Sequence, residues 1–201
     1  MNSRQKKALI TKNKIYNSAL ELIKRKGYEN VLIEDITDYA GLSKGSFYNH
    51  FSSKENLLHY TYKKTDIIYL NAYNEIESNS DFLKMIRLFV RLSYVEIEKL
   101  GNEIIRAMCL NLLSEETKET FFDKERALYT SLEKIIEVGK NSNILNSRIK
   151  TEFYVNKIIT LMVGIENYWC LLDKEEGLPD FAEESINTLI IGMIEIWIIK
   201  S

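Results

Sequence analysis

Proline is almost missing from this chain and glycine is scarce, with one proline and eight glycines among 201 residues. Because these two residues mark most turns and breaks, their scarcity excludes a turn-rich fold and favours long helices. A hydrophobic fraction of 45% is ample for a core. We therefore expect an all-α protein.

Residues that carry enzyme chemistry are also few. The two cysteines, Cys109 and Cys170, have neither metal-ligand spacing nor a disulfide framework. The two histidines, His50 and His59, belong to no Glu-x-x-His pair, and the chain has no Gly-x-Ser-x-Gly, P-loop or Gly-x-Gly-x-x-Gly motif. We expect no enzyme activity, no cofactor and no metal; the cysteines are expected to be buried, with redox sensing as the alternative.

Long apolar runs are missing as well. The longest, from Leu189 to Ile199, is interrupted by Gly192 and Glu195 and is shorter than the ~20 residues of a membrane span. The first 14 residues are polar and basic, without the apolar segment of a signal peptide. We expect a cytoplasmic protein with no membrane partner.

The net charge of −2 conceals an uneven distribution along the chain. Residues 1–64 contain 12 basic and 6 acidic side chains, a net of +6, whereas the remainder has a net of −8. A basic head on an acidic body is typical of a protein that binds nucleic acid at one end.

The basic part contains a helix, a glycine and a second, short helix. Residues 31–40 carry apolar side chains at helical spacing, and Gly41 suits the left-handed end of that helix. Ser43 is a good N-cap for the next helix, in which Phe47 and Phe51 share the inner face. This order predicts a helix-turn-helix.

The outer face of the short helix carries donors and no acid, as a helix in the major groove of DNA requires. The next helix starts at Ser52 or Ser53, and Ser52-x-x-Glu55 is a capping box. Lys54 lies at this start, where backbone N–H groups favour a phosphate. The predicted DNA-binding residues are Ser43, Lys44, Gly45, Ser46, Tyr48, Asn49, His50 and Lys54.

Several matches in register resemble the DNA-binding domain of the TetR family of bacterial repressors, over roughly the first third of the chain. They are Gly27-Tyr28, Ile33-x-Asp35-Ile36 and Ala-Gly-Leu-Ser-Lys-Gly-Ser-Phe-Tyr-x-His-Phe-x-Ser-Lys-Glu-x-Leu from Ala40 to Leu57. The resemblance implies that Tyr48, His50 and Lys54 position the DNA backbone, whereas Lys44 and Asn49 read bases. The family usually opens the second helix with Thr or Ser; Val31-Leu32 stands there instead, without a side-chain cap.

The remaining pattern predicts further helices over residues 81–100, 103–113, 114–139, 148–172 and 180–199, and the first helix over 11–26 after a frayed lead-in. The polar break at Ser78–Asp81 is the best boundary. We expect a helix-turn-helix domain at 1–51, a linking helix at 52–77, and an effector-binding and dimerisation domain at 78–201.

The last two helices are apolar almost all round, so more than one face must be covered. A second copy of the chain is the expected cover, and Gly164 to Cys170 with Gly192-Met193 is similar to the helix pair that dimerises many TetR-family proteins. The predicted interface residues are Ile158, Met162, Ile165, Ile190, Met193, Ile194 and Trp197.

Aromatic side chains are frequent in the body and could line a ligand cavity or fill a closed core. The predicted effector-binding residues are Tyr69, Tyr73, Phe89, Tyr94, Met108, Phe122, Tyr129 and Trp169. Such a wall favours a small hydrophobic or aromatic effector, and the acidic body mildly favours a neutral or cationic one.

Together these patterns favour a homodimeric, ligand-responsive repressor of the TetR family that binds a palindromic DNA operator. A helical protein-interaction module that retains the fold without ligand control is the alternative, and a small helical enzyme is a third.

Overall fold

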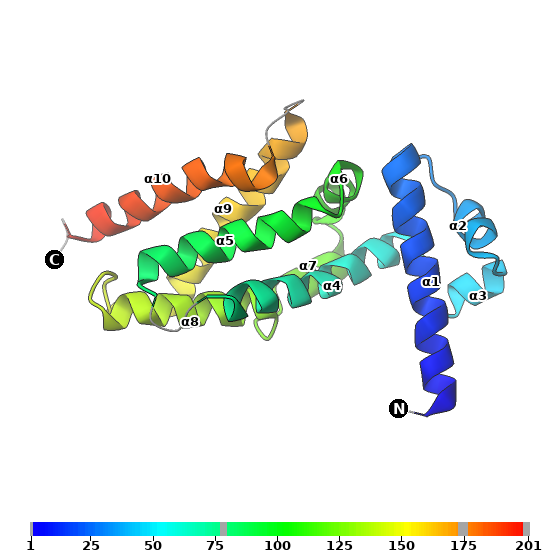
Figure 1. Ribbon diagram of the computed structural model, residues 1–201, viewed down its shortest axis with the longest axis horizontal. Helices are drawn as coiled ribbons and strands as arrows, with labels where there is room; N and C mark the ends of the chain where they lie inside the picture. Colours follow the sequence, from blue (N-terminus) through cyan, green and yellow to red (C-terminus); the bar gives the residue numbers. More distant parts are fainter. Residues whose placement is uncertain (1, 77–79, 173–176, 199–201) are drawn as a thin grey trace. The chain divides into compact units, whose positions relative to one another are not determined.

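The computed structural model describes residues 2–76, 80–172 and 177–198; of residues 191 and 193–198 it describes the backbone alone. The described residues form ten helices and no strand, which confirms the all-α prediction (Figure 1). The helices are α1 (Ser3–Lys26), α2 (Ile33–Ala40), α3 (Lys44–Tyr48), α4 (Lys54–Asn74), α5 (Phe82–Glu98), α6 (Asn102–Asn111), α7 (Glu115–Phe121), α8 (Ala127–Asn141), α9 (Thr151–Leu171) and α10 (Leu178–Ile198).

The chain divides into two compact units, Met1–Lys63 with Gly101–Phe121, and Lys64–Leu100 with Phe122–Ser201. The first unit therefore takes in α6 and α7 as well as the helix-turn-helix, and α4 contributes residues to both units. The predicted division into a helix-turn-helix domain at 1–51, a linking helix at 52–77 and an effector-binding and dimerisation domain at 78–201 differs from these two units and remains a prediction.

The first unit is built on the apolar stripe of α1, where Ile15, Ala19, Leu22 and Ile23 are buried as the spacing predicts. Aromatic rings join its helices: Tyr16 of α1 meets Tyr60 of α4 edge-on, with ring centroids 5.3 Å apart. Such pairs stabilise beyond the area that they bury. This packing joins α4 to α1, while α2 packs on α1 and α3 packs on α2.

The first half of α4 is tied to α6 and α7 by buried polar contacts. The Tyr62 hydroxyl donates to the Met108 carbonyl at 2.8 Å, and Nε2 of His59 lies 3.1 Å from the Thr120 hydroxyl. These bonds satisfy polar groups that would otherwise be costly to bury. They explain why α6 and α7 belong to the first unit.

The second unit has α5 at its centre, flanked by α8, α9 and α10, and Figure 1 shows α10 running alongside α5. The Tyr94 hydroxyl donates to the Met162 carbonyl at 2.9 Å, which joins α5 to α9. A Cβ added at Gly139 would lie 2.8 Å from the Phe82 ring, so α8 approaches α5 too closely for any other residue.

Two predicted helix boundaries are wrong. The first helix begins at Ser3 rather than near Thr11, because Asn2 and Gln5 form a reciprocal capping box with two bonds of 2.9 Å. The single helix predicted over 114–139 is interrupted between α7 and α8. There Asp66 of α4 holds Arg126 in two bonds of 3.0 and 3.2 Å.

Candidate DNA-binding surface

Gly41 makes the turn of the helix-turn-helix. Its φ of 61° and ψ of 44° are left-handed, a conformation that glycine adopts at little cost. The Leu42 N–H donates to the Thr37 carbonyl at 2.9 Å, which satisfies the end of α2. The turn therefore sets the angle at which α3 leaves α2.

The inner face of α3 is locked into the core. Phe47 and Phe51 are fully buried, their ring centroids lie 5.8 Å apart, and Phe51 also meets Tyr60 at 5.6 Å. At the start of α3, the Ser43 hydroxyl accepts the Ser46 N–H at 3.2 Å, as predicted. Because the inner face is fixed, the direction of the outer side chains is fixed as well.

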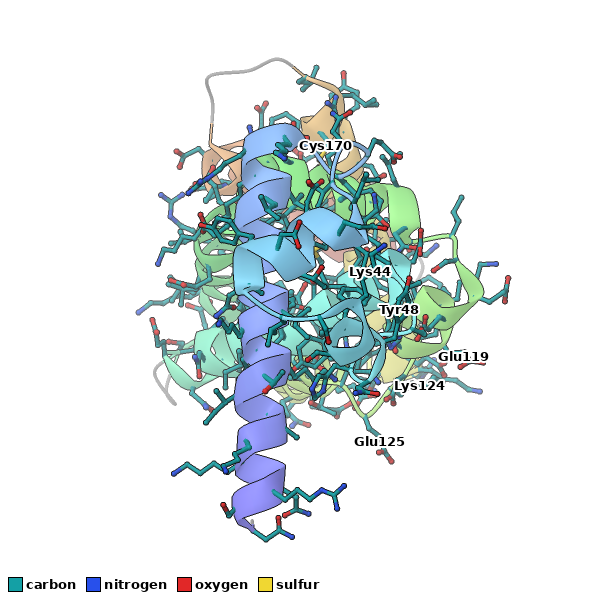
Figure 2. All side chains as sticks on the ribbon, turned by 90° about the vertical axis from the view of Figure 1, so that its right-hand side faces the viewer. Lys44, Tyr48, Glu119, Lys124, Glu125 and Cys170 are labelled. Carbon is teal, nitrogen blue, oxygen red and sulfur yellow. The ribbon has the colours of Figure 1, made fainter. Side chains whose placement is uncertain are left out.

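The structure brings the predicted outer residues together on one surface. Ser43, Lys44, Gly45, Tyr48 and Asn49 are exposed, and Ser46 and His50 are half-buried. Lys44 and Tyr48 are labelled in Figure 2, which looks onto this side of the first unit. The surface presents hydroxyl, amide, imidazole and ammonium groups.

One acidic side chain, Glu34 of α2, reaches this surface and pairs with Lys44. The hydrogen bond between them lowers the pKa of Glu34 and raises the pKa of Lys44. Both side chains are exposed, so water and salt screen the pair and a phosphate can compete for Lys44.

Gly45 is not required by the fold of the first unit. An added Cβ would meet nothing closer than the Ser43 hydroxyl, at 3.8 Å. A glycine within a helix costs stability relative to alanine. Because Gly45 has no side chain, a partner can approach the backbone of α3 closely at this point of its outer face.

Lys54 is placed differently from the expectation that its ammonium reaches a phosphate. Its Nζ donates to the backbone carbonyls of Tyr28 at 2.7 Å and Val31 at 3.0 Å, and lies 4.1 Å from the centre of the Tyr28 ring. These contacts engage the charge within the first unit. Lys54 is therefore better described as a residue that positions the start of α4.

Two helix starts on this surface show contacts that differ from the predicted ones. Leu32 has no side-chain cap, as predicted, but its N–H donates to the Asp35 carboxylate at 3.0 Å. Ser53 rather than Ser52 caps α4, accepting the Asn56 N–H at 3.1 Å. The Leu-x-x-Asp spacing was the available signal for the first of these contacts.

The predicted effector residues are only partly brought together. Five of them are buried in the second unit, where Tyr69 stacks on Phe89 at 6.1 Å, and Tyr73 is half-buried there. Met108 belongs to the first unit, and Phe122 is 65% exposed, so the predicted set is not buried together within one unit. The other buried members are Tyr94, Tyr129 and Trp169.

A surface pocket of about 130 Å³ lies elsewhere in the second unit, between α5 and α10. The Arg91 guanidinium at its rim pairs with Asp180 at 3.0 Å and with Glu183 at 2.6 Å. Its lining residues are Arg87, Leu88, Val90, Arg91, Pro179, Glu183 and Ile186, none of which was a predicted effector residue.

Buried polar groups near Tyr69 were not predicted from the sequence. The Arg126 side chain is 4% exposed and bonds to Asp66 and, at 3.2 Å, to the Thr65 hydroxyl. Glu166 of α9 is half-buried, and desolvation raises the pKa of its carboxyl to about 8. A single acid in an apolar helix gives no sequence signal of this environment.

The predicted dimer residues need a correction. Ile158, Met162, Ile165 and Ile190 are 2–3% exposed, so they face the core of their own unit. Met193, Ile194 and Trp197 have side chains outside the described residues. Helices that are apolar all round do not reveal their inner face, and the exposed face of α9 carries Gly164, Tyr168 and Leu171 instead.

The described residues contain neither a membrane-spanning helix nor a metal-binding cluster. No described helix is long and apolar enough to cross a membrane. No group of three or more His, Cys, Asp or Glu side chains in the described ranges is placed to hold a metal ion.

Known proteins with similar sequences and folds are regulators of transcription. Residues 15–61 match the model of the bacterial regulatory proteins of the tetR family. The uncharacterized HTH-type transcriptional regulator YvdT of Bacillus subtilis is 24% identical over 180 residues, covering 85% of this chain and 89% of that protein. The negative regulator IcaR of the Staphylococcus aureus biofilm operon icaADBC is 27% identical over 136 residues, 59% of this chain and 73% of IcaR.

The similarity to a solved structure extends over nearly the whole chain. The transcriptional regulator FadR from Bacillus subtilis, in complex with stearoyl-CoA, superposes with a TM-score of 0.74 at 17% identity. That match covers 89% of this chain and 97% of FadR. Residues 15–61 are therefore similar to the DNA-binding segment of the tetR family, and the chain as a whole shares its fold with the solved regulator FadR.

Proposed function

We propose that this protein is a repressor that binds a specific DNA sequence through the outer face of α3. The observation that carries the proposal is the set of exposed donors on α3, held in place by the buried rings of Phe47 and Phe51. A short helix of this kind fits the major groove, where Lys and Asn side chains distinguish base pairs. The negative regulator IcaR supports repression rather than activation.

The test is selection of binding sites from a pool of random DNA duplexes. The expected result is one enriched sequence with two-fold symmetry and half-sites about one helical turn, ~34–36 Å, apart. A pool that stays random after several rounds at physiological salt would contradict sequence-specific binding. That result would favour the helical interaction module.

The symmetric site requires a two-fold dimer, and the exposed face of α9 is the proposed contact. Tyr168 and Leu171 are 57% and 77% exposed on this face, and an added Cβ atom at Gly164, on the same face, would meet nothing within 4 Å. Small residues on an apolar face let a second helix approach closely. The partner of this face is a second copy of the chain, related by a two-fold axis.

The proposed effector is a hydrophobic molecule that binds in the second unit beside Tyr69 and Phe89 and releases the protein from DNA. FadR, which shares the fold, was solved with the long-chain thioester stearoyl-CoA. In this chain the half-buried carboxyl of Glu166, whose pKa is raised to about 8 by desolvation, favours a molecule with a polar, hydrogen-bonding end. No hydrogen bond or ion pair to that carboxyl is found among the described residues.

Fluorescence of Trp169, which is buried in the second unit, reports ligand binding. Hydrophobic cations, neutral aromatic compounds and acyl-CoAs are the probes, each tested for saturable quenching and for release of the selected DNA. A compound that does both is an effector. Quenching without release would contradict a switch, and no response to any class would favour a closed core.

A further inference from the structure

The first two turns of α1 lie outside the core of the first unit. Every residue from Asn2 to Ile10 is exposed, and Ile15 is the first buried residue of the helix. Figures 1 and 2 show these turns extending beyond α2 and α3. We refer to Ser3–Ile10 as the basic arm.

The arm carries positive charge only. Arg4, Lys6 and Lys7 lie on it, and the chain contains no acidic residue before Glu21. Among the described residues, none of the three cations has a hydrogen bond or ion pair through its side chain. The charge of the arm is therefore presented entirely to solvent.

Helix stability does not account for these charges. The first turn of α1 contains no acidic residue, and cations near a helix N-terminus oppose the helix dipole. Arg4 and Lys7, three residues apart, also repel each other. At the opposite end, Lys24, Arg25 and Lys26 occupy the last turn, where the dipole favours them. An anionic partner would offset both unfavourable terms at the first turn.

Contacts within the first unit place α1, two residues after the end of the arm, next to the residue that follows the candidate DNA surface in the chain. The Lys12 ammonium lies 4.1 Å from the centre of the Tyr60 ring and 5.1 Å from that of Phe51. Phe51 directly follows His50, which belongs to the surface. From Lys12 back to Arg4 the helix rises about 12 Å, so the arm projects past this edge.

We propose that the basic arm is a second DNA contact, which binds the phosphate backbone beside the groove that α3 enters. This inference rests on the proposed function. Three cations on one exposed helical segment can each neutralise a phosphate, and no contact among the described residues holds their side chains in the fixed geometry that base reading requires. The arm therefore adds affinity for any duplex and leaves the sequence preference to α3.

The test compares two triple variants that each remove three positive charges. The arm variant carries Arg4→Gln, Lys6→Gln and Lys7→Gln. The matched control carries Arg148→Gln, Lys134→Gln and Lys150→Gln, at exposed positions of the second unit. Binding of the selected site and of a scrambled duplex is measured by fluorescence anisotropy at several salt concentrations, with circular dichroism to check folding.

The arm variant should bind both duplexes at least about tenfold more weakly at 0.1 M salt, with a salt slope smaller by about 2–5 units for a dimer that carries two arms. The ratio of the two affinities and the melting temperature should stay unchanged. The control should keep the parent slope. Equal salt slopes for the arm variant and the parent would contradict the proposal that the arm contacts DNA. A parent protein with equal affinity for the two duplexes would instead contradict the proposed function.

An anionic membrane surface is the rival partner for a basic helix. Sedimentation with phosphatidylglycerol vesicles separates the two. Binding of the parent but not the arm variant to vesicles, together with equal salt slopes on DNA, would assign the arm to a membrane and contradict the proposal.

Discussion

At the start of α4, one ammonium group joins two segments of the first unit. Nζ of Lys54 bonds to the carbonyls of Tyr28 and Val31 in the connection between α1 and α2. Without it, both carbonyls would have to find other donors. Hydrogen bonds to charged groups contribute more to stability than hydrogen bonds between neutral groups. This lysine therefore stabilises the position of α4 against the connection between α1 and α2.

Lys54→Ala should lower the free energy of unfolding by about 1–3 kcal/mol, because two charge-assisted bonds are lost. Urea denaturation measures this change, and Lys63→Ala, at an exposed position of the same helix, is the control. An unchanged urea midpoint together with a salt slope lower by about one unit would instead assign Lys54 to a phosphate.

The acidity of Glu166 makes the stability of the protein depend on pH. Burial raises the pKa of this carboxyl to about 8, above its ordinary value of 4.5, so the folded protein binds a proton that the unfolded chain releases. The stabilising contribution is complete below about pH 4.5 and is lost as the pH rises toward 8. The neighbouring Cys170 is the smaller cause of the shift.

Glu166→Gln should therefore flatten the decline in the urea midpoint between pH 5 and pH 8, and raise the midpoint at pH 8. Glu125→Gln, at an exposed position of the second unit, should leave the parent profile intact. If the urea midpoints of Glu166→Gln and the parent change in parallel between pH 5 and pH 8, the carboxyl is solvated. That result would also contradict the proposal that a polar end of the ligand binds at Glu166.

Among the helices, those with local end signals could be predicted from the sequence. Gly41 and Ser43 mark the end of α2 and the start of α3 through contacts within a few residues. The break between α7 and α8 depends on Asp66 and Arg126, which are 60 positions apart, so no local pattern indicates it. The early start of α1 was missed because its cations argue against a helix N-terminus.

The candidate surfaces also divide into those that local sequence signals predict and those that depend on contacts between distant residues. The outer face of α3 was predictable because Phe47 and Phe51 define its inner face. The exposed face of α9 was not, because its apolar residues surround the helix and only packing against α8 and α10 distinguishes inside from outside. For Lys54, the sequence indicates charge at a helix start but not the carbonyls that bind it.

Gly164→Gln separates folding from dimerisation at the exposed face of α9. A side chain at this position meets nothing in its own protomer, and replacing glycine within a helix should stabilise the protomer by up to ~1 kcal/mol. In a closely packed two-fold interface the same side chain would clash. We expect light scattering to show a monomer with an unchanged or higher melting temperature; a variant that remains dimeric would exclude this face.

At the scale of the whole molecule, α4 contributes residues 54–63 to the first unit and the rest to the second. A ligand in the second unit can act on DNA binding only if its affinity differs between the bound and released conformations. The shared helix is the proposed route for that difference. The excess of basic residues lies in the first 64 positions, which contain the candidate DNA-binding surface.

The most direct test of the account is the discrimination between the selected site and a scrambled duplex by the parent and by Asn49→Ala. The parent should prefer the selected site strongly. Asn49→Ala should lose about 1–3 kcal/mol of that preference at particular base pairs while its affinity for scrambled DNA and its salt slope stay the same. Equal affinity of the parent for both duplexes at physiological salt would contradict sequence-specific binding by α3.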